Sequence, residues 1–140
     1  KWSKLQHSPL EALQQLPNLM ELQMLDAFTG YELVFEAGRF KKLKILYIEQ
    51  FDGLNKVVVQ QGATSELQKL TLGKCVNLKK LPLGINYLTH LKELILYDMP
   101  NEFISLLEKK SKDRKMVSHI HLIHSFTLGS NQLWSLQNLS

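Results

Sequence analysis

The chain of 140 residues has a single cysteine, no long apolar run and no dense basic stripe. Because Cys75 has no second cysteine with which to form a disulfide, the sequence predicts a protein of a reducing compartment. No apolar run approaches the roughly 18 residues that a membrane-spanning helix needs. No apolar signal segment follows Lys1. We therefore expect a cytoplasmic location and no membrane span.

The positive charge of the chain is modest and spread out. Seventeen Lys and Arg residues against thirteen Asp and Glu residues give a net charge of +4. The lysines gather in three separate places, at 41–44, 79–80 and 109–115. The last of these resembles a nuclear-localisation signal, although a solvated helix end is the simpler interpretation. A nucleic-acid platform would place basic and aromatic residues together on one face, so no nucleic-acid partner is predicted.

A repeat of constant period runs through the chain. Four stretches read L-x-x-L-x-(L/I/M), and each starts 24 residues after the previous one: LMELQM (19–24), LKILYI (43–48), LQKLTL (67–72) and LKELIL (91–96). A looser fifth copy is Val117-x-x-Ile120-x-Leu122. The first ten residues read as the back half of a repeat, so we expect a fragment that is incomplete at its N-terminus. A period of this length is typical of leucine-rich repeats.

Each repeat predicts one short strand and a return limb. In x-L-x-L the leucines point inwards and their neighbours point outwards, and the strands of successive units pair side by side. Closely spaced apolar residues in the return limb, such as Leu78, Leu81 and Leu88, predict a tight turn or a 3₁₀ segment under the sheet. The segment 98–110 predicts a helix with an apolar stripe that begins at Phe103.

The predicted fold class is α/β. It is a horseshoe-shaped leucine-rich-repeat solenoid of 24-residue repeats, with a short parallel sheet on the concave face and one C-terminal helix. The repeat domain is expected to cover residues 1–126. The polar stretch 127–140 is expected to be a loosely docked or disordered tail.

Two features invite a chemical interpretation. Cys75 follows the third strand at the position where leucine-rich repeats place Asn or Cys to fill the turn, which predicts packing instead of nucleophilic chemistry. The sequence HIHLIH (119–124) has a spacing that resembles a metal site. On a strand, however, His119 and His121 share one face while His124 has the other parity. We predict a surface pair of histidines, with no metal and no cofactor.

The order of the motifs resembles that of a known family. The motif F-x-x-L-K-x-L-x-I spans 40–48, A-x-x-x-L-x-K-L-x-L-x-x-C spans 63–75, L-P-x-G-I-x-x-L-x-x-L-x-x-L spans 81–94, and V-x-H-I after an F-I helix spans 117–120. Over about residues 8–126 the chain resembles the C-terminal leucine-rich repeats of plant intracellular disease-resistance proteins, and more narrowly the cereal group with an N-terminal coiled coil and a nucleotide-binding domain. His121, where such repeats commonly have proline, departs from this pattern, as does the tail.

The resemblance implies a role in immune signalling. In such receptors this region senses a pathogen effector, or the host target that the effector modifies, and it holds the nucleotide-binding domain inactive until then. The phosphate-binding motif G-x-x-x-x-G-K-(S/T) does not occur in this chain, so any ATP binding or hydrolysis is expected in an upstream domain and no enzyme is predicted here. A generic intracellular leucine-rich-repeat signalling scaffold is the alternative.

The side chains between the strand leucines predict three ladders across the concave face. The ladders are Gln23, Tyr47, Thr71, Ile95 and His121; Leu25, Glu49, Gly73, Tyr97 and Ile123; and Glu21, Ile45, Lys69, Glu93 and His119. Tyr47, Ile95 and Tyr97 are aromatic or apolar where the repeat does not require it, which favours a binding surface. The candidate partner-binding residues are Gln23, Ile45, Tyr47, Glu49, Lys69, Thr71, Glu93, Ile95, Tyr97, His119 and His121. Contact with a neighbouring domain of the same receptor explains this face equally well.

Overall fold

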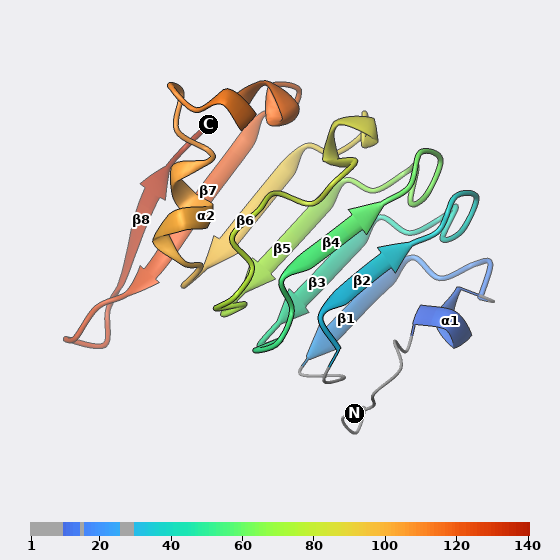
Figure 1. Ribbon diagram of the computed structural model, residues 1–140, viewed down its shortest axis with the longest axis horizontal. Helices are drawn as coiled ribbons and strands as arrows, with labels where there is room; N and C mark the ends of the chain where they lie inside the picture. The colour runs from blue at the N-terminus through green and yellow to red at the C-terminus, as the bar shows by residue number, and fades with distance from the viewer. Residues whose placement is uncertain (1–9, 15, 26–29) are drawn as a thin grey trace.

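The chain folds as a leucine-rich-repeat solenoid in the computed structural model, which describes residues 10–14, 16–25 and 30–140 (Figure 1). One sheet of six strands lies along one side of the molecule. Its strands, in spatial order, are β1 (Glu21–Leu25), β3 (Ile45–Glu49), β5 (Lys69–Gly73), β6 (Glu93–Tyr97), β7 (Leu122–Leu128) and β8 (Trp134–Asn138). The first five strands are parallel, and β8 is antiparallel to β7. The predicted fold class is confirmed.

The 24-residue period sets the register of the first four strands. Glu21 pairs with Ile45, Ile45 with Lys69, and Lys69 with Glu93. Each residue therefore lies beside its equivalent in the next repeat, as the sequence predicted. The inward leucines of these strands are almost completely buried, because the return limbs cover them from the other side.

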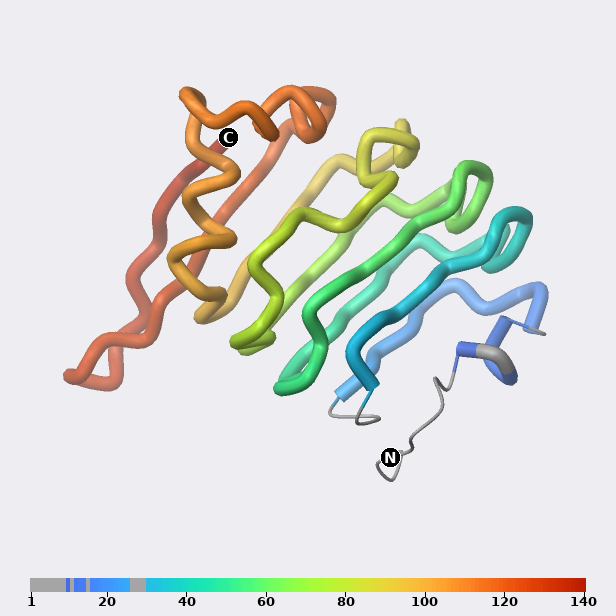
Figure 2. The backbone as a smooth tube through the Cα atoms, in the orientation of Figure 1, coloured from blue at the N-terminus to red at the C-terminus, as the bar shows by residue number. Residues whose placement is uncertain are grey.

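A second, smaller sheet forms on the return side of the solenoid, and the sequence analysis did not predict it. It pairs β2 (Glu32–Phe35) with β4 (Lys56–Val59) in parallel, and Figure 2 shows both limbs lying over the large sheet and running alongside its strands. Leu33 and Phe35 of β2 are fully buried between exposed or half-buried neighbours. That alternation, with period two, is the signal of a half-buried strand. The expected 3₁₀ segment is confirmed in the third repeat as η1 (Ile85–Tyr87).

The third return limb lies very close to β4, and Gly84 makes that approach possible. The amide of Leu83 donates to the carbonyl oxygen of Val57 over 2.8 Å, and the amide of Val59 donates to the carbonyl oxygen of Leu83 over 2.6 Å. Gly84 has a φ of 90°, and a Cβ placed there would lie 1.9 Å from the carbonyl oxygen of Val59. Only glycine can therefore occupy this position without moving backbone.

Both ends of the described chain pack on the core. The helix α1 (Leu10–Leu13) buries Leu10 and Leu13 against it. Residues 1–9 of the predicted repeat domain lie outside the described residues. The C-terminal helix α2 (Asn101–Ser105) is shorter than predicted and buries Phe103. It starts after Pro100, whose fixed φ suits a helix start.

The basic run 109–115 serves as a connector between α2 and β7. Its second half forms the 3₁₀ helix η2 (Lys112–Val117), which Ser111 caps by accepting a hydrogen bond from the amide of Asp113 over 3.1 Å. Arg114 Nη1 donates to the carbonyl oxygen of Leu107 over 2.8 Å and to that of Leu139 over 2.6 Å. This arginine thereby joins the turn after α2 to the end of the chain.

Candidate protein-binding face

The outward side chains of the six-stranded sheet form one continuous surface, here called the concave face. It arises because side chains alternate along a strand, so that Leu22 and Met24 are buried while Glu21, Gln23 and Leu25 face solvent. The pairing of β1, β3, β5 and β6 confirms the three predicted ladders across these four strands. Their role in binding a partner stays a prediction.

The fifth strand differs from the prediction by three residues. Glu93 pairs with Leu122, Ile95 with His124, and Tyr97 with Phe126, so the predicted ladder members His119, His121 and Ile123 were wrong. His119 lies in a turn and His121 in a bend before β7, and Ile123 points into the core.

The physical reason is an ambiguity of spacing. Val117, Ile120 and Ile123 recur at every third position, and all three are buried, so two alignments with the repeat were possible. The inward position that is Met, Ile or Leu in the earlier strands is Ser125 here, and it is buried at 3% exposure. Because this inward residue is polar, the hydrophobic pattern of the sequence did not indicate the correct register.

The segment 127–140 extends the concave face instead of forming a loosely docked tail. Its residues complete β7 and form β8, with Phe126 paired to Leu136 and Leu128 to Trp134. Paired residues of neighbouring strands share a face, so Trp134 and Leu136 lie on the concave face with 47% and 55% exposure. Leu139 is buried, and its amide donates to the carbonyl oxygen of Ile123 over 2.7 Å.

Three aromatic rings gather at this end of the concave face. The rings of Tyr97 and Phe126 stack with centroids 5.1 Å apart and planes 18° apart. The ring of Trp134 meets Tyr97 edge-on, with centroids 5.6 Å apart and planes at 81°. His124 approaches Phe126 edge-on at 6.4 Å. We call Tyr97, Phe126 and Trp134 the aromatic cluster. Sequence reasoning found only Tyr97, and recognising β8 would have supplied the other two.

Tyr47 and Glu49 form a fixed pair beside the aromatic cluster. The hydroxyl of Tyr47 donates a hydrogen bond to Oε1 of Glu49. Burial, and then the hydrogen bond and the charge of Glu49, raise the pKa of Tyr47 to about 12. Tyr47 therefore keeps its proton at neutral pH and holds the carboxylate in place.

The concave face carries two shallow hollows. The larger, of about 360 Å³, lies over the middle of the sheet and reaches from Glu21 to Phe126. The smaller, of about 240 Å³, is lined by Tyr47, Glu49, Lys74, Tyr97 and Trp134. Both are open to solvent and are hollows in an extended surface, which suits contact with a protein better than enclosure of a small molecule.

The concave face is negatively charged, although the chain is positively charged. Among the outward side chains of the six strands there are three glutamates, Glu21, Glu49 and Glu93, and one lysine, Lys69. The net charge of these strand positions is therefore −2, whereas the whole chain has +4. The basic residues lie mostly on loops and return limbs.

Cys75 lies under the concave face as a packing residue. It is completely buried, and its Sγ donates to the carbonyl oxygen of Gly73 over 3.4 Å. Burial, as the largest cause, raises the pKa of the Cys75 thiol to about 11. The thiol is therefore neutral and a weak nucleophile at physiological pH. The prediction that Cys75 packs the turn is confirmed, and the equivalent Phe51 and Met99 are also buried.

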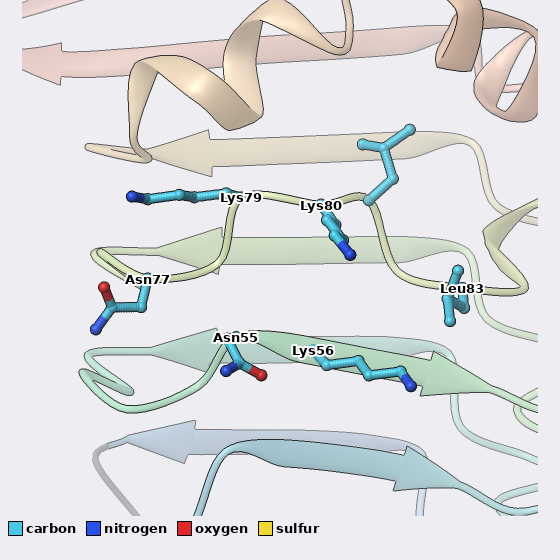
Figure 3. A pocket seen from close by; sticks show the side chains of 7 residues that line it. Asn55, Lys56, Asn77, Lys79, Lys80 and Leu83 are labelled. Carbon is cyan, nitrogen blue, oxygen red and sulfur yellow. The ribbon is translucent and has the colours of Figure 1, made fainter.

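A groove on the return side, away from the concave face, is lined by Asn55, Lys56, Asn77, Lys79, Lys80, Leu81 and Leu83 (Figure 3). It has a volume of about 420 Å³. Its charge is largely neutralised, because Lys56 pairs with Glu32 over 3.4 Å and Lys79 pairs with Glu102 over 3.5 Å. In Figure 3 Lys79 points along its limb away from Lys80. This groove is therefore a weaker candidate for a partner-binding surface than the concave face.

Within 10–14, 16–25 and 30–140, no group of three or more His, Cys, Asp or Glu side chains could hold a metal ion. No helix in this part of the chain is long and apolar enough to cross a membrane.

The chain is similar to several plant disease proteins. Disease resistance protein RPM1 of Arabidopsis thaliana is 38% identical over 125 residues, which are 89% of this chain and 13% of that protein. Disease resistance protein RPP8 of the same plant is 32% identical over 117 residues, or 83% of this chain and 13% of that protein. The disease susceptibility protein LOV1, also from Arabidopsis, is 35% identical over 96 residues, which are 68% of this chain and 10% of that protein.

Two other comparisons set the limits of this finding. No protein-family model matches the chain. No solved structure matches it either. The chain spans about an eighth of the length of the curated relatives that it matches. The resemblance to plant disease resistance proteins is confirmed, and the chain is a leucine-rich-repeat segment homologous to them.

Proposed function

We propose that this chain is the recognition and autoinhibitory segment of an intracellular plant immune receptor. The observation that carries the proposal is the aromatic cluster, which lies half exposed on the concave face of a segment homologous to disease resistance proteins. Tyr and Trp are enriched among the residues that dominate binding energy in protein interfaces. An exposed apolar patch of this kind on a soluble surface usually marks a partner.

The proposed partners are a pathogen effector, or the host protein that it modifies, and the nucleotide-binding domain of the same receptor. Both would use the concave face, so binding of one would displace the other and shift the receptor between resting and active states. Six strands about 4.8 Å apart span roughly 24 Å. That width suits one part of a standard protein interface, so neighbouring repeats would contribute the remainder.

The activity of the whole receptor is part of the same proposal, because the chain covers a small part of its relatives. The solenoid contributes binding and no chemistry, and ATP binding or hydrolysis belongs to an upstream nucleotide-binding domain. We place the receptor in the cytoplasm on the basis of the single buried thiol of Cys75. Neither nucleic acid nor a membrane span enters the proposal.

The alternative is a signalling scaffold that has the repeats without the upstream ATPase. Reading the gene upstream of Lys1 separates the two functions. A continuous frame that encodes a predicted strand followed by G-x-x-x-x-G-K-(S/T) and a helix supports the receptor, because this loop cradles nucleotide phosphates. A frame without that motif contradicts the receptor proposal and favours the scaffold.

A further inference from the structure

The smaller hollow of the concave face combines aromatic rings with a carboxylate. Tyr47 lies on β3, Tyr97 on β6 and Trp134 on β8, and all three line the same space of about 240 Å³ together with Glu49. We call this space the aromatic–carboxylate pocket. Its aromatic and acidic residues lie on three strands that are far apart in the sequence, between residues 47 and 134. The pocket therefore exists only when the sheet and the β7–β8 hairpin are assembled.

Gly73 lies against Glu49 and Tyr97, two residues that line this pocket. It stands between Glu49 and Tyr97 in the ladder that crosses β3, β5 and β6. A Cβ at Gly73 would meet Oε1 of Glu49 at 3.4 Å and Cβ of Tyr97 at 3.5 Å, both ordinary contacts, and the backbone there is not left-handed. The local geometry therefore does not require glycine. Glycine inside a strand often marks a place where another group approaches closely, and here the side chain of Glu49 lies over it.

The carboxylate of Glu49 is held in a fixed position at the pocket. It accepts the hydrogen bond of the Tyr47 hydroxyl and also lies over Gly73. The raised pKa of Tyr47 keeps the phenol as a donor at neutral pH. Oε1 of Glu49 is thus engaged. Its second oxygen, Oε2, makes no hydrogen bond or ion pair with the described residues.

We propose that the aromatic–carboxylate pocket binds an arginine side chain of the protein partner. This inference rests on the proposed function, since it names the chemistry of the group that the concave face would recognise. A guanidinium stacks on aromatic rings by cation–π attraction and donates hydrogen bonds to a carboxylate at the same time. The net charge of −2 on the strand positions complements a basic partner segment.

Lysine, apolar and acidic side chains fit the pocket less well. An ammonium group is a compact point charge. It has no flat face that could stack on Tyr97 while its hydrogens meet Glu49. An apolar side chain would leave the Glu49 carboxylate without a partner as the interface closes. An acidic side chain would face Glu49 directly. Lys74, whose exposed side chain also lines the pocket, is the one lining group that repels a cation.

The test is a titration of the 140-residue chain with N-acetyl-arginine amide, followed by NMR. The indole N–H signal of Trp134 reports on the pocket, and the variant Trp134→Phe identifies it beside the only other tryptophan, Trp2. We expect a saturable shift of this signal. N-acetyl-citrulline amide has nearly the same shape without the charge, and we expect it to bind at least tenfold more weakly.

Three variants make the assignment specific. Glu49→Gln removes the charge but keeps an acceptor for Tyr47, and it should weaken arginine binding about tenfold. Lys74→Ala removes the repelling charge and should strengthen binding about twofold. Glu108→Gln removes one negative charge from an exposed turn outside the pocket and should leave binding unchanged.

Equal binding of arginine and citrulline, or unchanged binding in Glu49→Gln, would overturn the inference. Weaker arginine binding in Lys74→Ala would also overturn it, because the loss of a neighbouring positive charge should favour a bound cation. The proposed function fails by a different result, an immune response that does not depend on the concave face. A receptor that needs this face while its pocket ignores arginine would overturn only the present inference.

Discussion

The ring of Tyr97 on β6 stacks on the ring of Phe126 on β7, with centroids 5.1 Å apart. Tyr97 was placed on the concave face by the repeat alone, whereas the repeat placed Ile123 where Phe126 stands. The stack thus exists only in the register that the structure has. It also connects the regular repeats to the hairpin of β7 and β8, which carries Trp134.

A double-mutant cycle tests this stack and the register together. Tyr97→Leu and Phe126→Leu remove the rings singly and together, and unfolding in urea gives the free energy of each protein. Stacked aromatic pairs couple by about 0.5–1.5 kcal/mol beyond their burial, so we expect a coupling energy of about 1 kcal/mol. A coupling near zero would contradict the contact.

Gly84 should tolerate substitution far less than Gly38. Both have positive φ, at 90° and 77°, but a Cβ at Gly84 meets the backbone of Val59 while one at Gly38 meets nothing within 4 Å. Gly38→Ala should lose about 1–2 kcal/mol for the left-handed conformation alone. Gly84→Ala should lose clearly more, because backbone must move as well. Equal losses in urea unfolding would show that the close approach does not matter.

Much of this fold was predictable because the repeat is periodic. The inward leucines of four strands keep a spacing of 24 residues, so one alignment fixed the register of β1, β3, β5 and β6. The return limbs were harder. Leu33 and Val57 are also 24 residues apart, as are Phe35 and Val59, but only two limbs form strands and the third contains η1 instead. The pairing of β4 with β2 depends on hydrogen bonds between limbs, which a single repeat does not reveal.

The candidate site was less predictable than the fold. Tyr47 and Tyr97 followed from the ladders, but Phe126 and Trp134 did not. The insert before β7 obscured the register, and Ser125 stands at an inward position that is apolar in the earlier strands. All 5 residues of β8 are exposed, so it carries no burial pattern that would mark a strand. Only its pairing with β7 defines it.

The thiol of Cys75 predicts a loss of stability in alkaline solution. Burial raises its pKa from 9.0 to about 11, so the unfolded chain releases this proton at a lower pH than the folded chain does. The stabilisation is therefore complete below pH 9 and is lost as the pH rises towards 11. Between about pH 8 and about pH 10, the urea midpoint should fall more in the natural chain than in Cys75→Ala. Tyr47 remains in both proteins, so an equal fall would contradict this account of the thiol.

Arg114 should hold the end of the chain in place. Its guanidinium donates to the carbonyl oxygens of Leu107 and Leu139, and hydrogen bonds from charged groups contribute about 1.5–3 kcal/mol. In Arg114→Ala the amides of β7 and β8 should exchange with solvent faster, while those of β1 and β3 keep their protection. Lys115→Ala removes the same charge from an exposed neighbour and should change nothing. Unchanged exchange in both variants would show that Arg114 does not anchor the hairpin.

The central claim is that a receptor uses the concave face of this chain to recognise a partner or to hold itself inactive. The most direct measurement introduces Tyr47→Ala and Tyr97→Ala together into the full-length receptor in leaves, with receptor abundance monitored. The control is Tyr31→Ala with Tyr87→Ala, which removes two tyrosines, 70% and 45% exposed, that lie outside the concave face. We predict that only the first variant loses the response to the pathogen that the receptor restricts, or signals without it. Normal response and normal resting activity at normal abundance would contradict the claim.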